Sequence, residues 1–185
     1  MIGLVFRLKP DIRILGIDDG KFQRGISISS ILAGVLVRLD RTIENMATTR
    51  ITVDGADIVD GIKEILDRIR VRPSLIMADG VTFAGFNIID PVELFTITGI
   101  SVMTVHRGLP DISSMLSAIR SLQDARKESV LLSLNPSRVV LAGKEYTINT
   151  AGIESEEAIA VLRKTVVNGY LPEPIRLAHM LASSF

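Results

Sequence analysis

The sequence contains no cysteine, no tryptophan and only two histidines. The lack of cysteine excludes a disulfide framework, zinc sites built on thiolates and catalysis by a cysteine nucleophile. It also suits a reducing compartment, and we expect a cytoplasmic protein. Aromatic residues make up only 4% of the chain. Aromatic platforms on which unpaired bases stack are therefore scarce.

Neither sign of charge dominates, because 21 Lys and Arg balance 21 Asp and Glu. No overall positive field draws this chain to DNA, RNA or an anionic membrane, so any nucleic-acid contact must come from a local patch.

The mean hydropathy is +0.37, but the strongest apolar stretch, residues 31–37, ends at Arg38. Such a stretch is too short to span a bilayer, and the N-terminus lacks the long apolar core of a secretory signal. We expect no membrane partner, and the apolar composition leaves a homo-oligomer open.

Apolar residues are nevertheless abundant enough for one core. At 185 residues, with 47% hydrophobic and 23% charged side chains, the chain is expected to form a single domain over residues 1–185. Apolar and β-branched runs predict strands at residues 12–18, 25–39, 48–54, 74–79 and 100–105, and a hairpin around Gly143. Helical periodicity predicts helices at residues 57–72, 91–98, 111–123, from 155 onward and at 172–182, with Asp57 and Ser155 as N-caps. The segment 124–140 gives no clear pattern before the hairpin.

The order of these elements predicts an α/β fold. Three antiparallel strands are followed by parallel strands in one mixed sheet, which is flanked by helices. We expect the ends of the first and fourth strands to meet at one edge, the usual ligand-binding face of open α/β sheets. The direction of the third strand is left open by the sequence.

Aspartates close three of the predicted strands. Asp18 and Asp19 stand together in residues 16–20 (Gly-Ile-Asp-Asp-Gly), and Asp54 and Asp79 each precede a glycine. Converging carboxylates would supply hard oxygen ligands for Mg²⁺ or Mn²⁺, and two such ions would stabilise the attacking water and the leaving oxygen of a phosphodiester. The alternative assigns each aspartate only to its own turn, because Asp and Gly are ordinary turn residues.

The C-terminal segment carries a resemblance. Residues 168–182 (Asn-Gly-Tyr-Leu-Pro-Glu-Pro-Ile-Arg-Leu-Ala-His-Met-Leu-Ala) resemble the LPEPxRxAdxla ending of endonuclease V proteins. Residues 14–18 are similar to the first strand of that family, and residues 75–80 resemble its later strand that ends in Asp-Gly. A closer resemblance is to a mostly archaeal family of uncharacterised proteins related to endonuclease V, which shares an IRxLGIDDG opening and a PEPxRxAH close. The resemblance covers residues 12–182 and implies an RNase H-like fold.

The resemblance also implies a site and an activity. Asp18, Asp54 and Asp79 would hold a Mg²⁺ or Mn²⁺ ion, with Asp54 as a shorter substitute for the catalytic Glu of endonuclease V. Asp19 would be an auxiliary metal-binding carboxylate. Arg107 stands in the place of the active-site Lys of that family, where it would counter the charge of a phosphate. The implied activity is that of a metal-dependent endonuclease acting on DNA or RNA.

The sequence departs from endonuclease V in two places. Residues 44–48 offer no aromatic-and-proline wedge, which that family uses to separate bases around a deaminated purine, and residues 81–86 replace its glycine- and histidine-containing loop. The resemblance therefore does not carry inosine specificity to this chain.

Two other functions stay open. One is a non-catalytic module that keeps the fold and binds nucleic acid or a protein partner. The other is nucleotide binding, because residues 16–20 resemble the first phosphate loop of actin and sugar-kinase folds, although those folds need two such domains. His106 is expected to be a hydrogen-bonded surface residue rather than a ligand, and His179 to pack or face solvent.

Overall fold

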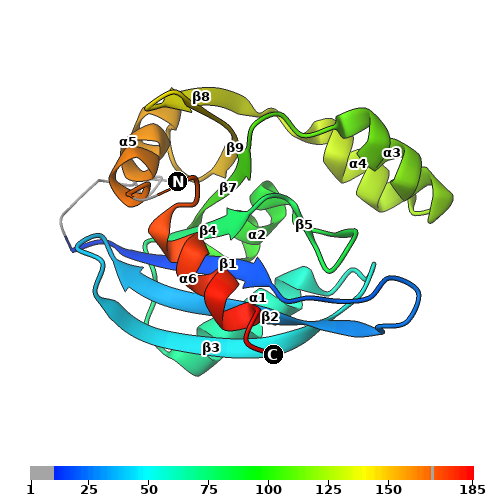
Figure 1. Cartoon of the computed structure of the whole chain (residues 1–185), viewed down its shortest axis with the longest axis horizontal. Helices are drawn as coiled ribbons and strands as arrows, with labels where there is room; N and C mark the ends of the chain where they lie inside the picture. Colours follow the sequence, from blue (N-terminus) through cyan, green and yellow to red (C-terminus); the bar gives the residue numbers. More distant parts are fainter. Residues whose placement is uncertain (1–10, 168) are drawn as a thin grey trace.

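A seven-stranded mixed sheet organises the chain (Figure 1). The computed structural model describes residues 11–167 and 169–185. The strand order is β3-β2-β1-β4-β7-β9-β8, and β5 and β6 form a separate small hairpin. The strands are β1 (Arg13–Asp19), β2 (Ser29–Arg38), β3 (Ile43–Thr52), β4 (Leu75–Asp79), β5 (Thr82–Phe83), β6 (Asn87–Ile88), β7 (Ser101–Arg107), β8 (Ser137–Leu141) and β9 (Lys144–Ala151). The helices are α1 (Ile58–Ile69), α2 (Pro91–Thr98), α3 (Ile112–Ser121), α4 (Ala125–Ser133), α5 (Ser155–Thr165) and α6 (Glu173–Ala182).

The sheet confirms the expected antiparallel meander followed by parallel strands. β1 pairs antiparallel with β2, and β2 pairs antiparallel with β3, whereas β4 pairs in parallel with both β1 and β7. Two antiparallel steps restore the direction of the chain, so β3 runs the same way as β1. The ends of β1, β3 and β4 therefore lie at one edge of the sheet, which answers the question that the sequence left open.

Several strand boundaries differ from the sequence prediction: β3 begins at Ile43 rather than at residue 48, and β7 extends to Arg107 rather than to residue 105. Left-handed backbone explains two other differences. β2 begins at Ser29 rather than at residue 25, because Gly25 lies in a turn with φ of 78°. β3 ends at Thr52 rather than at residue 54, because Asp54 has φ of 53° and has left the extended conformation. Few non-glycine residues adopt this conformation. Asp54 thus belongs to a tight loop rather than to a strand end.

Helices cover both faces of the sheet. The buried isoleucines of α1 recur at helical spacing and pack on one face together with Leu94 of α2, against Leu15 and Ile17 of β1. On the other face, α5 and α6 pack against Ile14 and its neighbours in β4 and β7. Alternate residues of β1 thus enter two different cores, as the pleat of a strand requires. None of the helices within residues 11–167 and 169–185 has the length and apolar character needed to cross a bilayer.

Helix α6 lies directly against β1 because two glycines allow its backbone to approach (Figure 1). A Cβ atom on Gly16 would overlap the carbonyl of Pro174, and one on Gly20 would lie 2.8 Å from the carbonyl oxygen of Ala182. The strand advances about 3.3 Å and the helix about 1.5 Å per residue, so four strand residues match the eight helix residues from 174 to 182. The helix therefore runs along β1, and its middle turn lies over the strand position between the two glycines.

A side-chain cap explains where α4 begins, but not where α1 or α5 begins. α4 was not predicted, and it begins after Asp124, whose side chain accepts a hydrogen bond from the Lys127 N–H at 3.1 Å. Asp57 does precede α1, but its carboxylate accepts hydrogen bonds from Thr52 rather than capping the helix. Ser155 is the first residue of α5 and makes no capping hydrogen bond. The pair α3 and α4 packs against the β5–β6 hairpin.

Candidate active site at the carboxyl edge of the sheet

Asp18 and Asp79 lie side by side at the ends of β1 and β4. These strands are adjacent and parallel, with Ile17 opposite Ala78, so the next residue on each strand is an aspartate. Residues paired at the same level point to the same face, here the face covered by α6. Asp18 is only 5% exposed. Burial raises the pKa of Asp18 to about 7, and the negative charge of Asp79 contributes to this rise.

His179 of α6 contacts the first of these two aspartates. The Nδ1 atom of His179 lies 2.7 Å from Oδ2 of Asp18, and the imidazole side chain is 54% exposed. This hydrogen bond favours the ionised carboxylate and opposes the rise in the pKa of Asp18. The expectation that His179 only packs or faces solvent was incomplete. Two sequence signals pointed to the contact, Gly16 and Gly20, because glycines inside a strand often mark the close approach of another backbone.

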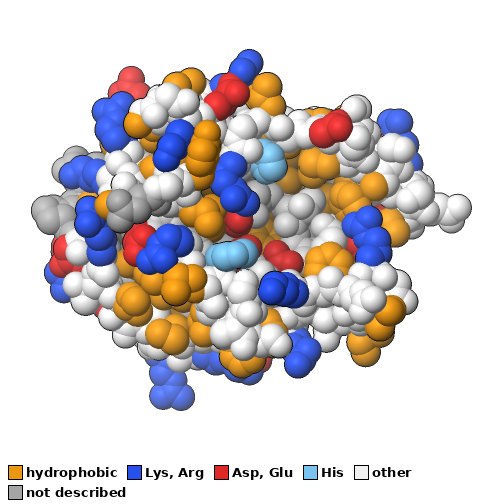
Figure 2. Space-filling model, in the orientation of Figure 1, with side chains coloured by type: hydrophobic (Ala, Val, Ile, Leu, Met, Phe, Trp, Pro, Cys, Tyr) orange, Lys and Arg blue, Asp and Glu red, His pale blue; other side chains and the backbone are white. Residues whose placement is uncertain are grey.

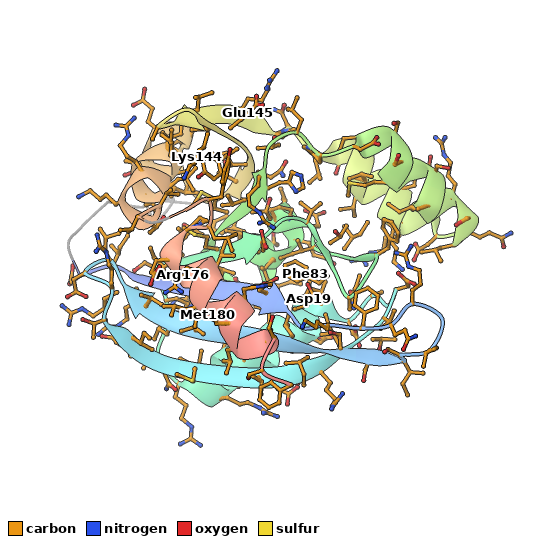
Figure 3. All side chains as sticks on the ribbon, in the orientation of Figure 1. Asp19, Phe83, Lys144, Glu145, Arg176 and Met180 are labelled. Carbon is orange, nitrogen blue, oxygen red and sulfur yellow. The ribbon has the colours of Figure 1, made fainter. Side chains whose placement is uncertain are left out.

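Asp19 points to the opposite face from Asp18, toward the loop that follows β5. Its Oδ2 accepts a hydrogen bond of 2.9 Å from the Ala84 N–H, and Figure 3 shows it beside Phe83. Burial raises the pKa of Asp19, and the Ala84 N–H opposes that effect. The charge of Asp79 also acts on Asp19, so the carboxylates of Asp18, Asp19 and Asp79 share one electrostatic environment.

Asp54 holds the same loop from the other side. Its Oδ1 accepts a hydrogen bond from the Phe86 N–H at 2.8 Å, and its own N–H donates to the Ala84 carbonyl at 2.8 Å. The buried Lys127 Nζ donates to the Asp54 carbonyl oxygen at 2.6 Å. Asp54 is not among the charges that shift the pKa values of Asp18 or Asp79. The structure therefore brings Asp54 to the correct edge of the sheet but directs its carboxylate into a backbone contact.

Arg107 and His106 approach Asp79 from β7. Burial raises the pKa of Asp79, whereas the positive charge of Arg107 opposes that rise. Burial also lowers the pKa of His106, and Asp79 opposes that shift. His106 is exposed as expected, although its ring makes no hydrogen bond within the described ranges. All three residues line an open cavity of about 700 Å³ that also reaches Glu145 and Tyr170.

The surface around this edge combines acidic and basic groups. Figure 2 shows the two histidines on either side of acidic side chains, with lysines and arginines nearby. Groups of both charges therefore lie side by side at this edge.

The carboxylates at this edge can be assessed as ligands for a metal ion. Within residues 11–167 and 169–185, no three His, Asp or Glu side chains converge closely enough to hold a metal ion by themselves. Two neighbouring carboxylates still suit Mg²⁺, which keeps several water ligands and is commonly held by one or two carboxylates together with substrate phosphates. Asp18 and Asp79 therefore fit an ion that binds with its substrate.

Sequence relatives of this chain are archaeal. A UPF0215 protein of Methanopyrus kandleri is 37% identical over 182 residues, which cover 95% of this chain and 92% of that protein. A UPF0215 protein of Thermoplasma volcanium is 38% identical over 177 residues, which cover 94% of this chain and 90% of that protein. The predicted relation to a mostly archaeal family is thus confirmed.

Solved structures confirm the RNase H-like fold. A protein of unknown function from Archaeoglobus fulgidus superposes with a TM-score of 0.80 at 28% identity, covering 94% of this chain and 97% of that one. Endonuclease V from Streptomyces avermitilis gives a TM-score of 0.66 at 14% identity, covering 96% and 82%. Endonuclease V from Ciona intestinalis, in complex with inosine-containing DNA, gives 0.64 at 13% identity, covering 93% and 84%. The profile of the family described as endonuclease dU matches residues 10–185, so the chain belongs to the endonuclease dU family.

Proposed function

We propose that this protein is a divalent-metal-dependent endonuclease that cleaves DNA at deoxyuridine. The observation that carries the proposal is the pair formed by the buried Asp18 and the half-buried Asp79 at the ends of adjacent parallel strands. The description of the family, endonuclease dU, supports the choice of substrate. The similarity to an endonuclease V bound to DNA supports nucleic acid as the ligand. Inosine is not part of the proposal, because the chain lacks the wedge residues of endonuclease V.

In this proposal Asp18 and Asp79 are the direct ligands of Mg²⁺ or Mn²⁺. Asp19 serves as an auxiliary carboxylate through the oxygen that Ala84 leaves free. Asp54 does not contact the ion in this proposal. Its carboxylate orients the loop at residues 84–86, which Asp19 also contacts. The bound ion would supply Lewis-acid activation of water and charge stabilisation at the leaving oxygen.

The neighbouring basic residues have separate roles. His179 holds the Asp18 carboxylate in one orientation through the 2.7 Å hydrogen bond. Arg107 lies beside Asp79 in the open cavity, where its guanidinium would pair with the phosphate of the strand. Burial lowers the pKa of His106, which favours the neutral imidazole, the form that accepts a proton from water.

The test is nicking of a duplex with one deoxyuridine in the presence of Mn²⁺ or Mg²⁺. We expect Asp18→Asn and Asp79→Asn each to lose at least about a hundredfold in rate, which is the scale of an interaction made in the transition state. Asp67→Asn is the matched control, because Asp67 is exposed on α1 and remote from this edge. Undiminished nicking by both site variants, or none by the wild type with either metal, would refute the proposal.

The alternative is a non-catalytic module that binds nucleic acid or a protein partner. The lack of a complete three-ligand group among the described residues favours it. Its signature would be DNA binding that is equal in EDTA and in Mn²⁺, with no metal-dependent nicking.

A further inference from the structure

The side chain of Lys127 in α4 is buried although it carries a charge. It is only 6% exposed, and its Nζ lies 3.2 Å from Oδ2 of Asp124 and 2.6 Å from the carbonyl oxygen of Asp54. Lysine is almost never fully buried unless it is paired, because its ammonium group loses hydration there. Asp124 supplies the countercharge from the start of the same helix. The contact with Asp54 instead spans 73 residues of the chain and reaches the acidic edge of the sheet.

This long-range contact is one of three hydrogen bonds that hold a left-handed backbone. Asp54 has φ of 53°, and Ala84, to which it is bonded, has φ of 42°. Residues other than glycine rarely adopt this conformation, and it persists only where the surrounding contacts impose it. The N–H of Asp54 donates to the Ala84 carbonyl, and its Oδ1 accepts from the Phe86 N–H. The third hydrogen bond, from Lys127 to the Asp54 carbonyl, comes from α4, outside both loops.

The loop at residues 84–86 carries this constraint to Asp19. The Ala84 N–H donates to Oδ2 of Asp19 at 2.9 Å, while the Ala84 carbonyl accepts from the Asp54 N–H at 2.8 Å. One residue thus joins the two aspartates. The next residue, Gly85, has φ of 87°, and a Cβ atom there would overlap Oδ1 of Asp54. Hydrogen bonds of 2.6–2.9 Å therefore connect Lys127 to Asp19 through Asp54 and Ala84.

We propose that Lys127 is a positioning residue of the acidic edge, which sets the carboxylate of Asp19 through Asp54 and the loop at residues 84–86. The inference rests on the proposed function, in which Asp19 is an auxiliary metal-binding carboxylate. Lys127 itself contacts neither ion nor DNA, because its side chain is buried. The carboxylates of a catalytic site need supporting hydrogen bonds to fix their orientation, and a displacement of about 1 Å can cost a hundredfold in rate. Helix α4 thus supports the active site.

The first experiment observes the loop without requiring cleavage. Hydrogen exchange of the Ala84 and Phe86 amides is followed by NMR in EDTA, without DNA. Lys127→Met keeps an unbranched side chain but removes the donor, so we expect both amides to exchange at least about tenfold faster.

Arg126→Met is the matched control. Arg126 is the neighbour of Lys127 on α4, and its guanidinium binds the exposed carboxylate of Glu93 of α2 at 2.7 and 2.9 Å. Its loss removes a tie between α4 and the rest of the protein without touching Asp54. Since an exposed ion pair contributes little stability, exchange of both amides should stay within about twofold of the wild type.

The second experiment asks whether Lys127 acts on the reaction through Asp19. In nicking of the deoxyuridine duplex with Mn²⁺, Lys127→Met should lower kcat by about tenfold to a hundredfold and leave KM for the duplex within about twofold. In an Asp19→Asn background the same substitution should cost less than about threefold, because residues that act through one another are not additive. Arg126→Met should keep the kcat of the wild type.

The outcomes separate the two proposals. Unchanged exchange of both amides in folded Lys127→Met, or equally fast exchange in Arg126→Met, would overturn the positioning role. An unchanged kcat, or an equal loss of kcat in the Asp19→Asn background, would overturn the route through Asp19. If the wild type nicks with neither metal, the proposed catalytic function fails, and the exchange result alone decides whether Lys127 positions the loop. Thermal unfolding shows which variants are folded; if Lys127→Met is not, Lys127→Gln takes its place, because its shorter side chain stays polar but does not reach the Asp54 carbonyl.

Discussion

Replacing Asp18 by Asn should stabilise the metal-free protein at alkaline pH. Burial and the charge of Asp79 raise the pKa of Asp18 from its ordinary value of 3.8 to about 7. The folded state therefore holds a proton that the unfolded chain releases, so stability is full below pH 4 and falls as the pH rises to about 7. At 1.36 kcal/mol per pKa unit, ionised Asp18 lowers the free energy of unfolding by on the order of 4 kcal/mol. Asn cannot ionise, and it keeps the size and an acceptor for His179.

Thermal unfolding followed by circular dichroism in EDTA tests this reasoning. For a chain of this length the melting temperature shifts by about 2–4 °C per kcal/mol, so the variant should melt on the order of 10 °C above the wild type at pH 8 and only slightly above it at pH 4. Mn²⁺ should raise the melting temperature of the wild type and leave the variant unchanged. Asp67→Asn, an exposed substitution, should show no pH-dependent difference. A variant that melts at or below the wild type at pH 8 would refute the argument.

Three further outcomes follow from contacts around this edge. Gly16→Ala should lower the free energy of unfolding by about 3 kcal/mol or more in urea denaturation, because the added methyl overlaps the Pro174 carbonyl and pushes α6 away. Asp54→Ala should lower it by about 1–3 kcal/mol, since a partly buried backbone N–H loses its acceptor. His179→Ala should raise the pKa of Asp18 further, as followed by carboxyl NMR, because the hydrogen bond that favours the ionised form is lost; an unchanged pKa would contradict this.

The sequence predicts an element correctly where the capping and turn residues at its ends agree with the hydrophobic periodicity between them. α2 spans residues 91–98 as predicted, because Asp90 caps its start with Pro91 in the first turn and Gly99 ends it in the left-handed conformation. β4 is a short, almost wholly apolar run, which predicts a central strand buried on both faces, and the structure confirms the strand. α4 escaped prediction because it buries only Lys127 and Leu131, too few positions to form a recognisable apolar stripe.

The sequence predicts those parts of the site whose positions depend only on the direction of the strands. Asp18 and Asp79 converge because parallel neighbours end at the same edge, and this follows from the element order. Asp54 could not be placed in the same way, since its left-handed backbone turns the carboxylate into the loop. The partner of Asp18 was equally hidden, because the contact with His179 depends on how closely α6 docks on β1. Gly16 and Gly20 indicate that another backbone approaches β1, but they do not show which helix approaches or which of its side chains reaches Asp18.

The loop at residues 84–86 links the carboxylate edge to the apolar cluster of α3 and α4. Asp19 and Asp54 bind its backbone from the side of the sheet. Phe86 packs into the same apolar cluster as Leu131. The backbone of this loop thus connects Asp19 and Asp54 to the apolar cluster through hydrogen bonds of 2.8–2.9 Å. Asp19 and Asp54 therefore act through the loop, whereas Asp18 and Asp79 form the pair on the face covered by α6.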